Sequence, residues 1–133
     1  MTVTTNPAVQ LYERLQAHDV DKIDELLTPD FHGHGMGGDG PDSLVGALRF
    51  WLTAFPDTTI DIHDVITADD KVVVRATMRG THQAKFLGVE PTGKPFEIGS
   101  TDVHRLVDGR IAESWGLCDL ATMLIQVGAF TVS

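Results

Sequence analysis

Cysteine, basic residues and long apolar runs are all scarce in this chain of 133 residues. Its one cysteine, Cys118, has no partner for an internal disulfide, which favours a reducing compartment. No apolar run approaches the roughly 18–20 residues of a membrane-spanning helix. The segment from Met1 to Thr5 is short and polar, and it lacks the apolar core of a signal peptide. We therefore expect a soluble cytoplasmic protein without a membrane partner.

The basic residues are also few relative to the acidic ones. Ten Lys and Arg stand against nineteen Asp and Glu, which gives a formal net charge of −9. A phosphate backbone would be repelled by this charge, and no basic stripe along the chain offsets it. We therefore do not expect nucleic acid to be a partner of this protein.

The length fits one domain, residues 1–133, with a flexible N-terminus at residues 1–6. Apolar residues recur at helical spacing in the first half of the chain and at the tail. The spacing predicts helices at Pro7–Ala17, Val20–Leu27, Asp42–Ala54 and Leu120–Val127.

In the second half the apolar period changes to that of a strand, with many Val, Ile and Thr residues. Asp69-Asp70 and Asp108-Gly109 are predicted hairpin turns. The expected strands are Phe31–His34, Thr59–Thr67, Lys71–Thr81, Pro95–Val107 and Arg110–Cys118. Three helices followed by a meander of strands predict an α+β fold.

A set of short motifs then falls in a recognisable order. The motifs are Pro29-Asp30-Phe31, Gly80-Thr81-His82, Phe86-Leu87-Gly88-Val89, Pro91-Thr92-Gly93-Lys94, Asp108-Gly109-Arg110-Ile111 with Glu113 and Trp115, and finally Asp119 with Gln126-Val127-Gly128. In this order the chain resembles the SnoaL-like polyketide cyclases of the nuclear transport factor 2-like superfamily.

The resemblance implies a curved antiparallel sheet, a cone-like half barrel, that encloses an apolar pocket together with three N-terminal helices. It also implies a homodimer, and a small hydrophobic molecule in the pocket. The founding members close a polyketide ring in antibiotic biosynthesis by aldol condensation, with an aspartate as general acid/base and without metal or cofactor. Relatives on the same scaffold include hydrolases, dehydratases, atypical hydroxylases and pocket proteins without known chemistry, and the fold does not select among them.

Asp119 matches the family's catalytic aspartate and follows the last strand. An aspartate in an apolar pocket has a raised pKa, which suits proton transfer. The alternative is structural, because Asp119 also precedes the last helix and Asp commonly caps a helix. The acid/base hypothesis depends on this carboxyl group lying inside the pocket.

A two-residue turn at Asp108-Gly109 fixes the register of the two strands that flank it. In that register Trp115 lies opposite Asp102, and Glu113 lies opposite His104. Asp102 and His104 are then further candidate catalytic residues in the pocket, with a structural bond from His104 to Glu113 as the alternative. By the same alternation Cys118 points away from the pocket.

The other candidate residues would bind the substrate. The resemblance often places a histidine at the position of His34, where it could bond to the substrate; His32 and His34 could instead hold a metal, but no further ligand is evident. A planar substrate would stack on an aromatic face. The candidate pocket residues are Trp51, Trp115, Phe86, Met78 and Ser100. The loop from Gly35 to Gly40 is either a lid over the pocket or a plain connector.

The chain departs from the family pattern at two positions. Many relatives have a histidine just before the tryptophan of the last strand, where this chain has Ser114, and an aspartate just after it, where this chain has Gly116. Both positions are expected to point away from the pocket. The leading hypothesis is thus a cofactor-free acid/base enzyme, an aldol-type cyclase acting on a hydrophobic carbonyl compound. A non-catalytic binding or dimerisation module is the competing class.

Overall fold

The computed structural model describes residues 6–35 and 37–129 of the chain. Residues 1–5 of the predicted flexible N-terminus lie outside the described residues, as does Met36 of the glycine-rich loop. The helices are α1 (Pro7–Gln16), α2 (Pro41–Ala54) and α3 (Leu120–Gln126). The strands are β1 (Leu27–His34), β2 (Thr59–Ala68), β3 (Lys71–Thr81), β4 (Pro95–Val107) and β5 (Arg110–Cys118).

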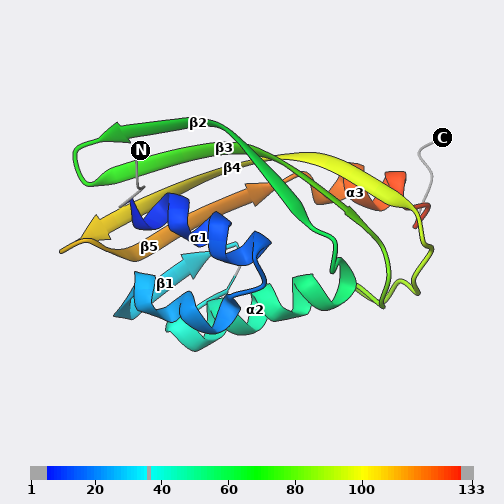
Figure 1. Ribbon diagram of the computed structural model, residues 1–133, viewed down its shortest axis with the longest axis horizontal. Helices are drawn as coiled ribbons and strands as arrows, with labels where there is room; N and C mark the ends of the chain where they lie inside the picture. Colours follow the sequence, from blue (N-terminus) through cyan, green and yellow to red (C-terminus); the bar gives the residue numbers. More distant parts are fainter. Residues whose placement is uncertain (1–5, 36, 130–133) are drawn as a thin grey trace.

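The N-terminal helices form one layer of the molecule (Figure 1). Asn6 caps α1 by accepting a hydrogen bond of 2.9 Å from the backbone N–H of Ala8, and Pro7 occupies the first helical position. The second predicted helix is wrong, because Val20–Lys22 and Asp24–Leu26 form two separate 3₁₀ turns. Described helices are all too short to cross a membrane.

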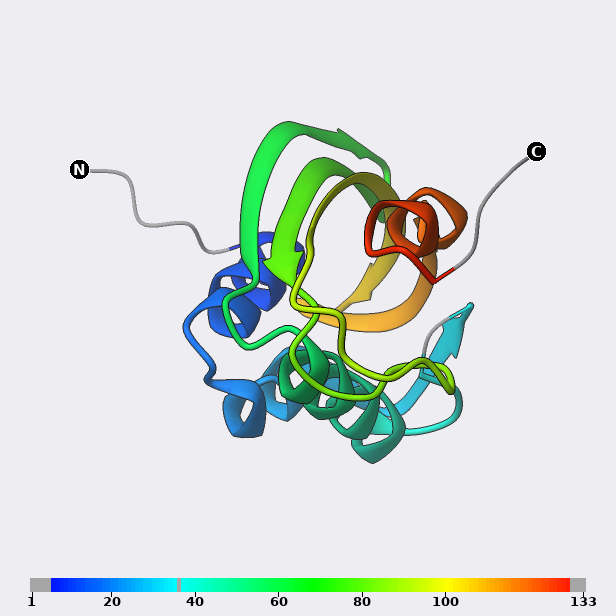
Figure 2. The ribbon, with the colours of Figure 1, turned by 90° about the vertical axis from the view of Figure 1, so that its right-hand side faces the viewer.

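The five strands form one open, curled sheet in the order β1-β5-β4-β3-β2. Figure 2 shows the sheet curling over the helices, with α3 beside its open end. The prediction of an antiparallel sheet needs a correction, since β1 runs parallel to β5 and the sheet is mixed. The hollow, concave face of this sheet meets α1 and α2, and most buried apolar side chains lie between these layers.

The predicted pairing of β4 with β5 is correct only at the turn. Val107 lies opposite Arg110, as expected from the Asp108-Gly109 hairpin, whose two residues both have positive φ angles. A β-bulge then shifts the register, so that Arg105 lies opposite Glu113 and Ala112 is the extra residue of β5. One extra residue moves every later side chain of β5 to the opposite face of the sheet.

Helix α3 lies beside β4 at the end where β5 no longer pairs with it. Beyond Cys118, the backbone of β4 has no neighbouring strand on that side, and the side chain of Gln126 pairs with it instead. The backbone N–H of Glu97 donates to Oε1 of Gln126 at 2.7 Å, and Nε2 of Gln126 donates to the carbonyl of Glu97 at 3.0 Å. This contact holds α3 at the edge of the sheet.

Candidate active site

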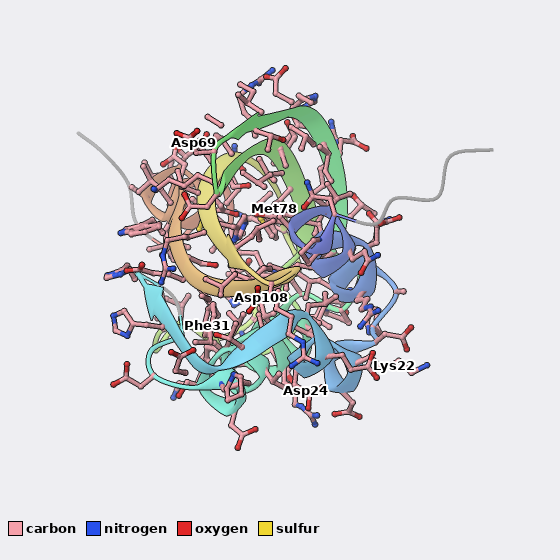
Figure 3. The ribbon with its side chains drawn as sticks, turned by 90° about the vertical axis from the view of Figure 1, so that its left-hand side faces the viewer. Lys22, Asp24, Phe31, Asp69, Met78 and Asp108 are labelled. Carbon is pink, nitrogen blue, oxygen red and sulfur yellow. The ribbon has the colours of Figure 1, made fainter. Side chains whose placement is uncertain are left out.

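A cavity of about 300 Å³ lies between the concave face of the sheet and helices α1 and α2. Met78, on β3, lies inside the curl of the sheet (Figure 3). Apolar residues line most of the cavity, namely Leu11, Leu15, Leu44, Leu48, Trp51, Met78, Leu117 and Leu120. Its polar side chains gather on β4 and β5, with one more from α1: Tyr12, Ser100, Asp102, His104, Ser114 and Cys118.

Four of these polar residues, Tyr12, Asp102, His104 and Ser114, are joined by a continuous series of hydrogen bonds. The Tyr12 hydroxyl lies 2.5 Å from Oδ2 of Asp102 and 2.7 Å from Nε2 of His104. On the other side of the imidazole, Nδ1 lies 2.7 Å from the hydroxyl of Ser114. The second carboxylate oxygen of Asp102 accepts the backbone N–H of Leu117 at 3.1 Å. The side chain of Asp102 is therefore fixed at both oxygens.

Burial shifts the pKa of all three titratable residues in this hydrogen-bonded series. Desolvation raises the pKa of Asp102, although its hydrogen bonds from Tyr12 and Leu117 oppose the rise. Desolvation lowers the pKa of His104 to about 4, so its ring is neutral at physiological pH. Desolvation, together with the nearby charge of Asp102, raises the pKa of Tyr12 and keeps its hydroxyl protonated.

A neutral imidazole carries one N–H, so which atom donates each of these hydrogen bonds depends on whether Asp102 is ionised or protonated. When Asp102 is ionised, Tyr12 donates to it, Nε2 of His104 donates to Tyr12, and Ser114 donates to Nδ1. When Oδ2 of Asp102 is protonated, all three hydrogen bonds can reverse. These hydrogen bonds therefore give each polar atom a partner whether Oδ2 of Asp102 is ionised or protonated, and a proton taken up at Oδ1 would leave the bond from Tyr12 to Oδ2 unchanged.

The structure brings five of the predicted site residues to the cavity: Asp102, His104, Ser100, Trp51 and Met78. The bulge also turns Ser114, Gly116 and Cys118 toward it, so the expectation that these three residues point away is wrong. The expected bond from His104 to Glu113 is absent, because His104 contacts Tyr12 and Ser114 instead. Tyr12 was missed because its place on the inward face of α1 is equally typical of a core residue.

Asp119 does not lie in the cavity, which corrects the position expected from the sequence. Its carboxylate caps α3, accepting the hydroxyl of Thr122 at 2.6 Å and the backbone N–H of Thr122 at 3.1 Å. These two bonds, the hydroxyl first, lower the pKa of Asp119. The side chain is exposed and borders a second hollow, together with Arg75 and Thr101. This hollow adjoins the cavity, with which it shares Ser100, Leu117, Cys118 and Leu120. The structural alternative describes the geometry of Asp119.

His34 and Trp115 also lie away from the cavity, on the outer face of the sheet. Their rings stack with centroids 5.1 Å apart and planes 3° apart. Nε2 of His34 bonds to Glu113 at 2.7 Å, and Arg105 donates to the other oxygen of Glu113 at 3.0 Å. The expectation that Trp115 faces the cavity is wrong, since the bulge turns its side chain outward.

Phe86 does not line the cavity either. It is buried among aromatic rings, 4.9 Å from Phe55 and 5.6 Å from Trp51 between centroids. Across residues 6–35 and 37–129, no group of three or more potential ligands could hold a metal ion. Gly35 borders the cavity, but the glycine-rich loop includes Met36, so its predicted role as a lid falls partly outside the described residues.

Comparison with known proteins assigns the chain to a family. The model of the SnoaL-like polyketide cyclase family matches residues 6–127. Among solved structures, IdmH from Streptomyces antibioticus, a proposed polyketide cyclase, is 34% identical with a TM-score of 0.82, over 93% of this chain and 97% of that chain. AclR from Streptomyces galilaeus, a proposed hydroxylase, is 25% identical with a TM-score of 0.83, over 94% of this chain and 95% of that chain.

TsrD from Streptomyces laurentii is 25% identical with a TM-score of 0.84, over 97% of this chain and 100% of that chain. No curated protein matches the chain. The matched region includes every strand, both long helices and all the polar residues of the cavity, which defines an α+β protein of the polyketide cyclase type. The chain belongs to the SnoaL-like polyketide cyclase family.

Proposed function

We propose that this protein is a cofactor-free acid/base enzyme that closes a ring in a hydrophobic, polyketide-like carbonyl compound by an aldol-type reaction. Asp102 is its general acid and base. The observation that carries the proposal is the half-buried carboxyl group of Asp102, held by Tyr12 and by the N–H of Leu117 at the polar end of an apolar cavity. Family membership and the likeness to IdmH support a cyclase-type function.

The proposed reaction needs one proton acceptor that later becomes a donor. The ionised carboxylate of Asp102 takes a proton from the carbon next to a carbonyl group, and the electron pair of that C–H bond forms an enolate. The enolate carbon attacks a second carbonyl of the same molecule, and Asp102 returns its proton to the new alkoxide. The raised pKa of Asp102 strengthens it as a base. Tyr12 and His104 act as positioning residues, because Tyr12 holds the carboxylate of Asp102 and His104 in turn holds the hydroxyl of Tyr12.

The first half of this reaction can be measured without the natural substrate. We expect the protein to catalyse exchange of the α-protons of 2-tetralone, a neutral bicyclic ketone, with deuterium from the solvent. Asp102→Asn should lower the catalysed rate by about two orders of magnitude, the usual contribution of a general acid/base. The measurement is the loss of the α-proton signal by NMR in D₂O, corrected for exchange without protein.

Asp119→Asn is the matched control, because it makes the same chemical change outside the cavity and Asn still caps a helix. It should leave the exchange rate unchanged. Loss of exchange in Asp119→Asn, or normal exchange in Asp102→Asn, would contradict the assignment. Binding of 2-tetralone without any exchange would instead indicate the non-catalytic binding module.

A second candidate function is hydroxylation, or another addition to the substrate, in the same cavity. The observation in its favour is the likeness to AclR, a proposed hydroxylase. The two functions differ in the mass of the product formed from a polyketide substrate. Ring closure by aldol addition leaves the mass unchanged, whereas hydroxylation adds one oxygen atom, which mass spectrometry distinguishes directly.

We further propose that two copies associate through the outer face of the sheet. Leu117 is 74% exposed there, and the partly exposed Val103 and Trp115 are its apolar neighbours on β4 and β5. Burying this apolar surface would stabilise a dimer. Light scattering should give the mass of a dimer for the wild type and of a monomer for Leu117→Asp, whose charge would be buried in the interface. A monomeric wild type would contradict the dimer.

A further inference from the structure

Gly116 leaves a gap in the row of side chains that lines the cavity. On β5 the cavity-facing residues are Ser114, Gly116 and Cys118, and they lie opposite His104, Asp102 and Ser100 of β4. A Cβ atom on Gly116 would lie 3.4 Å from Oδ1 of Asp102, with no other heavy atom within 4 Å. Gly116 is exposed, so Asp102 can be approached from this side. We call the gap over Gly116 the glycine notch.

Ser100 supplies a second, independent feature beside the notch. It lines the cavity and is only 6% exposed. Its hydroxyl is not a sealed, unpaired polar atom of the core, and no side-chain hydrogen bond within the described residues occupies it, so it is free to bond to a ligand in the cavity. Ser100 and Asp102 are two residues apart on β4 and face the same side. A ligand in the notch can therefore reach both side chains.

We propose that the substrate approaches Asp102 through the glycine notch and that its carbonyl oxygen accepts a hydrogen bond from Ser100, so that these two positions determine which substrates react. The inference rests on the proposed function of Asp102 and adds the direction of approach. The carbon next to the carbonyl then lies over Gly116, where Oδ1 of Asp102 takes its proton. The charge that develops on the carbonyl oxygen is stabilised by the hydroxyl of Ser100.

This geometry defines the class of substrate. It requires a ketone with a C–H group beside the carbonyl, because the proton acceptor and the hydrogen-bond donor lie next to each other on one strand. The ketone must also be neutral, because the described lining of the cavity includes Asp102 but neither Lys nor Arg. The rest of the molecule contacts the apolar walls formed by Leu44, Leu48 and Trp51. A substituent on the reacting carbon must fit the notch, so ketones branched at that carbon should react poorly.

Gly116→Ala tests the notch with the smallest possible change. Gly116 does not have a positive φ angle, so alanine fits its backbone, and the added methyl group covers the approach to Asp102. We expect kcat/KM for deuterium exchange into 2-tetralone to fall by about tenfold or more. Gly99→Ala is the matched control, because Gly99 lies on the outer face with no heavy atom within 4 Å of its Cβ position. It should exchange at the wild-type rate.

Ser100→Ala tests the hydroxyl separately. It should lower kcat by about tenfold or more, since the lost bond stabilises developing charge. Thr101→Ala, which removes a hydroxyl from the outer face, should have no effect. Circular dichroism and melting curves establish that each variant is folded.

Occupation of the cavity can be followed independently at Cys118, which lines it and is the only cysteine. In the wild type, 2-tetralone should slow the reaction of Cys118 with iodoacetamide. In Gly116→Ala and Ser100→Ala, slow exchange together with normal protection at saturating 2-tetralone would support the inference.

Normal exchange in both variants, with exchange lost in Asp102→Asn, would overturn the inference and leave the proposed function intact. Absence of exchange in the wild type itself would instead overturn the proposed function. The two failures are therefore distinguishable.

Discussion

At the scale of single residues, His104 is the most constrained member of the site. It is 2% exposed, and both of its ring nitrogens are in hydrogen bonds, to Tyr12 and to Ser114. Burial favours the neutral ring, and the pKa of His104 is lowered to about 4. Stability and site geometry are therefore linked through this one side chain.

This linkage predicts a pH dependence of folding. Between pH 6.5 and about 4, the unfolded chain binds a proton at this histidine and the folded chain does not. Stability is then complete above pH 6.5 and is lost as the pH falls toward 4, by about 3 kcal/mol at about 1.4 kcal/mol per pH unit. Urea titrations across this range should show the fall in the wild type and a flatter profile in His104→Gln.

Asp102 contributes with the opposite sign. Its raised pKa means that the folded state holds a proton more tightly than the unfolded state does, so its contribution to stability falls as the pH rises above the ordinary range of Asp. Asp102 is present in both proteins, so the difference between wild type and His104→Gln reports the histidine. A wild-type profile as flat as that of His104→Gln would contradict the buried, neutral ring.

Residue identity alone could not separate an aspartate that lines the cavity from one that caps a helix. Asp119 and Asp102 are both aspartates at the edge of apolar stretches, but Asp119 precedes Leu120 and caps α3, whereas Asp102 is fixed inside the cavity. Asp102, His104 and Ser100 were found from alternation along β4. Tyr12 comes from α1, and only the packing of α1 on the sheet brings it within 2.5 Å of Asp102.

At the scale of elements, the sequence predicted strands β3, β4 and β5 with their bounds. Alternation and turn signals are local, and the Asp108-Gly109 turn pairs Val107 with Arg110 as expected. The bulge at Ala112 could not be predicted, since no Gly or Pro marks it and both Ile111 and Ala112 are buried. It explains why Trp115 was placed in the cavity and Gly116 outside it.

Long-range pairing was the second limit at this scale. The parallel contact of β1 with β5 joins segments far apart in the chain, and nothing in residues 27–34 indicates their partner. The two 3₁₀ turns before β1 differ from the predicted helix for a related reason. Leu26 and Leu27 are both buried, but Leu27 already belongs to β1, so the apolar pattern spans two elements.

At the scale of the whole molecule, charge and shape together restrict the ligand. The chain carries a net charge of −9, and the described lining of the cavity includes Asp102 but neither Lys nor Arg. An anionic ligand would be repelled by the negative charge of the protein and would then lie beside the half-buried carboxyl group of Asp102, with no cation in the described lining to offset it. At separations of about 4 Å such a repulsion amounts to several kcal/mol near a protein surface.

We therefore expect the folded protein to discriminate between 2-naphthol and 2-naphthoate, which share a ring system and differ in charge at neutral pH. At a concentration of about 100 times its Kd, the neutral naphthol should stabilise the protein by about 2.7 kcal/mol, visible as a higher Tm in calorimetry. The naphthoate should give little or no shift at the same concentration. In Asp102→Asn the difference between the two should shrink, because the repelling charge is gone while the apolar walls remain. Equal stabilisation of the wild type by both compounds would show that the cavity admits anions, and the requirement for a neutral substrate would then be wrong.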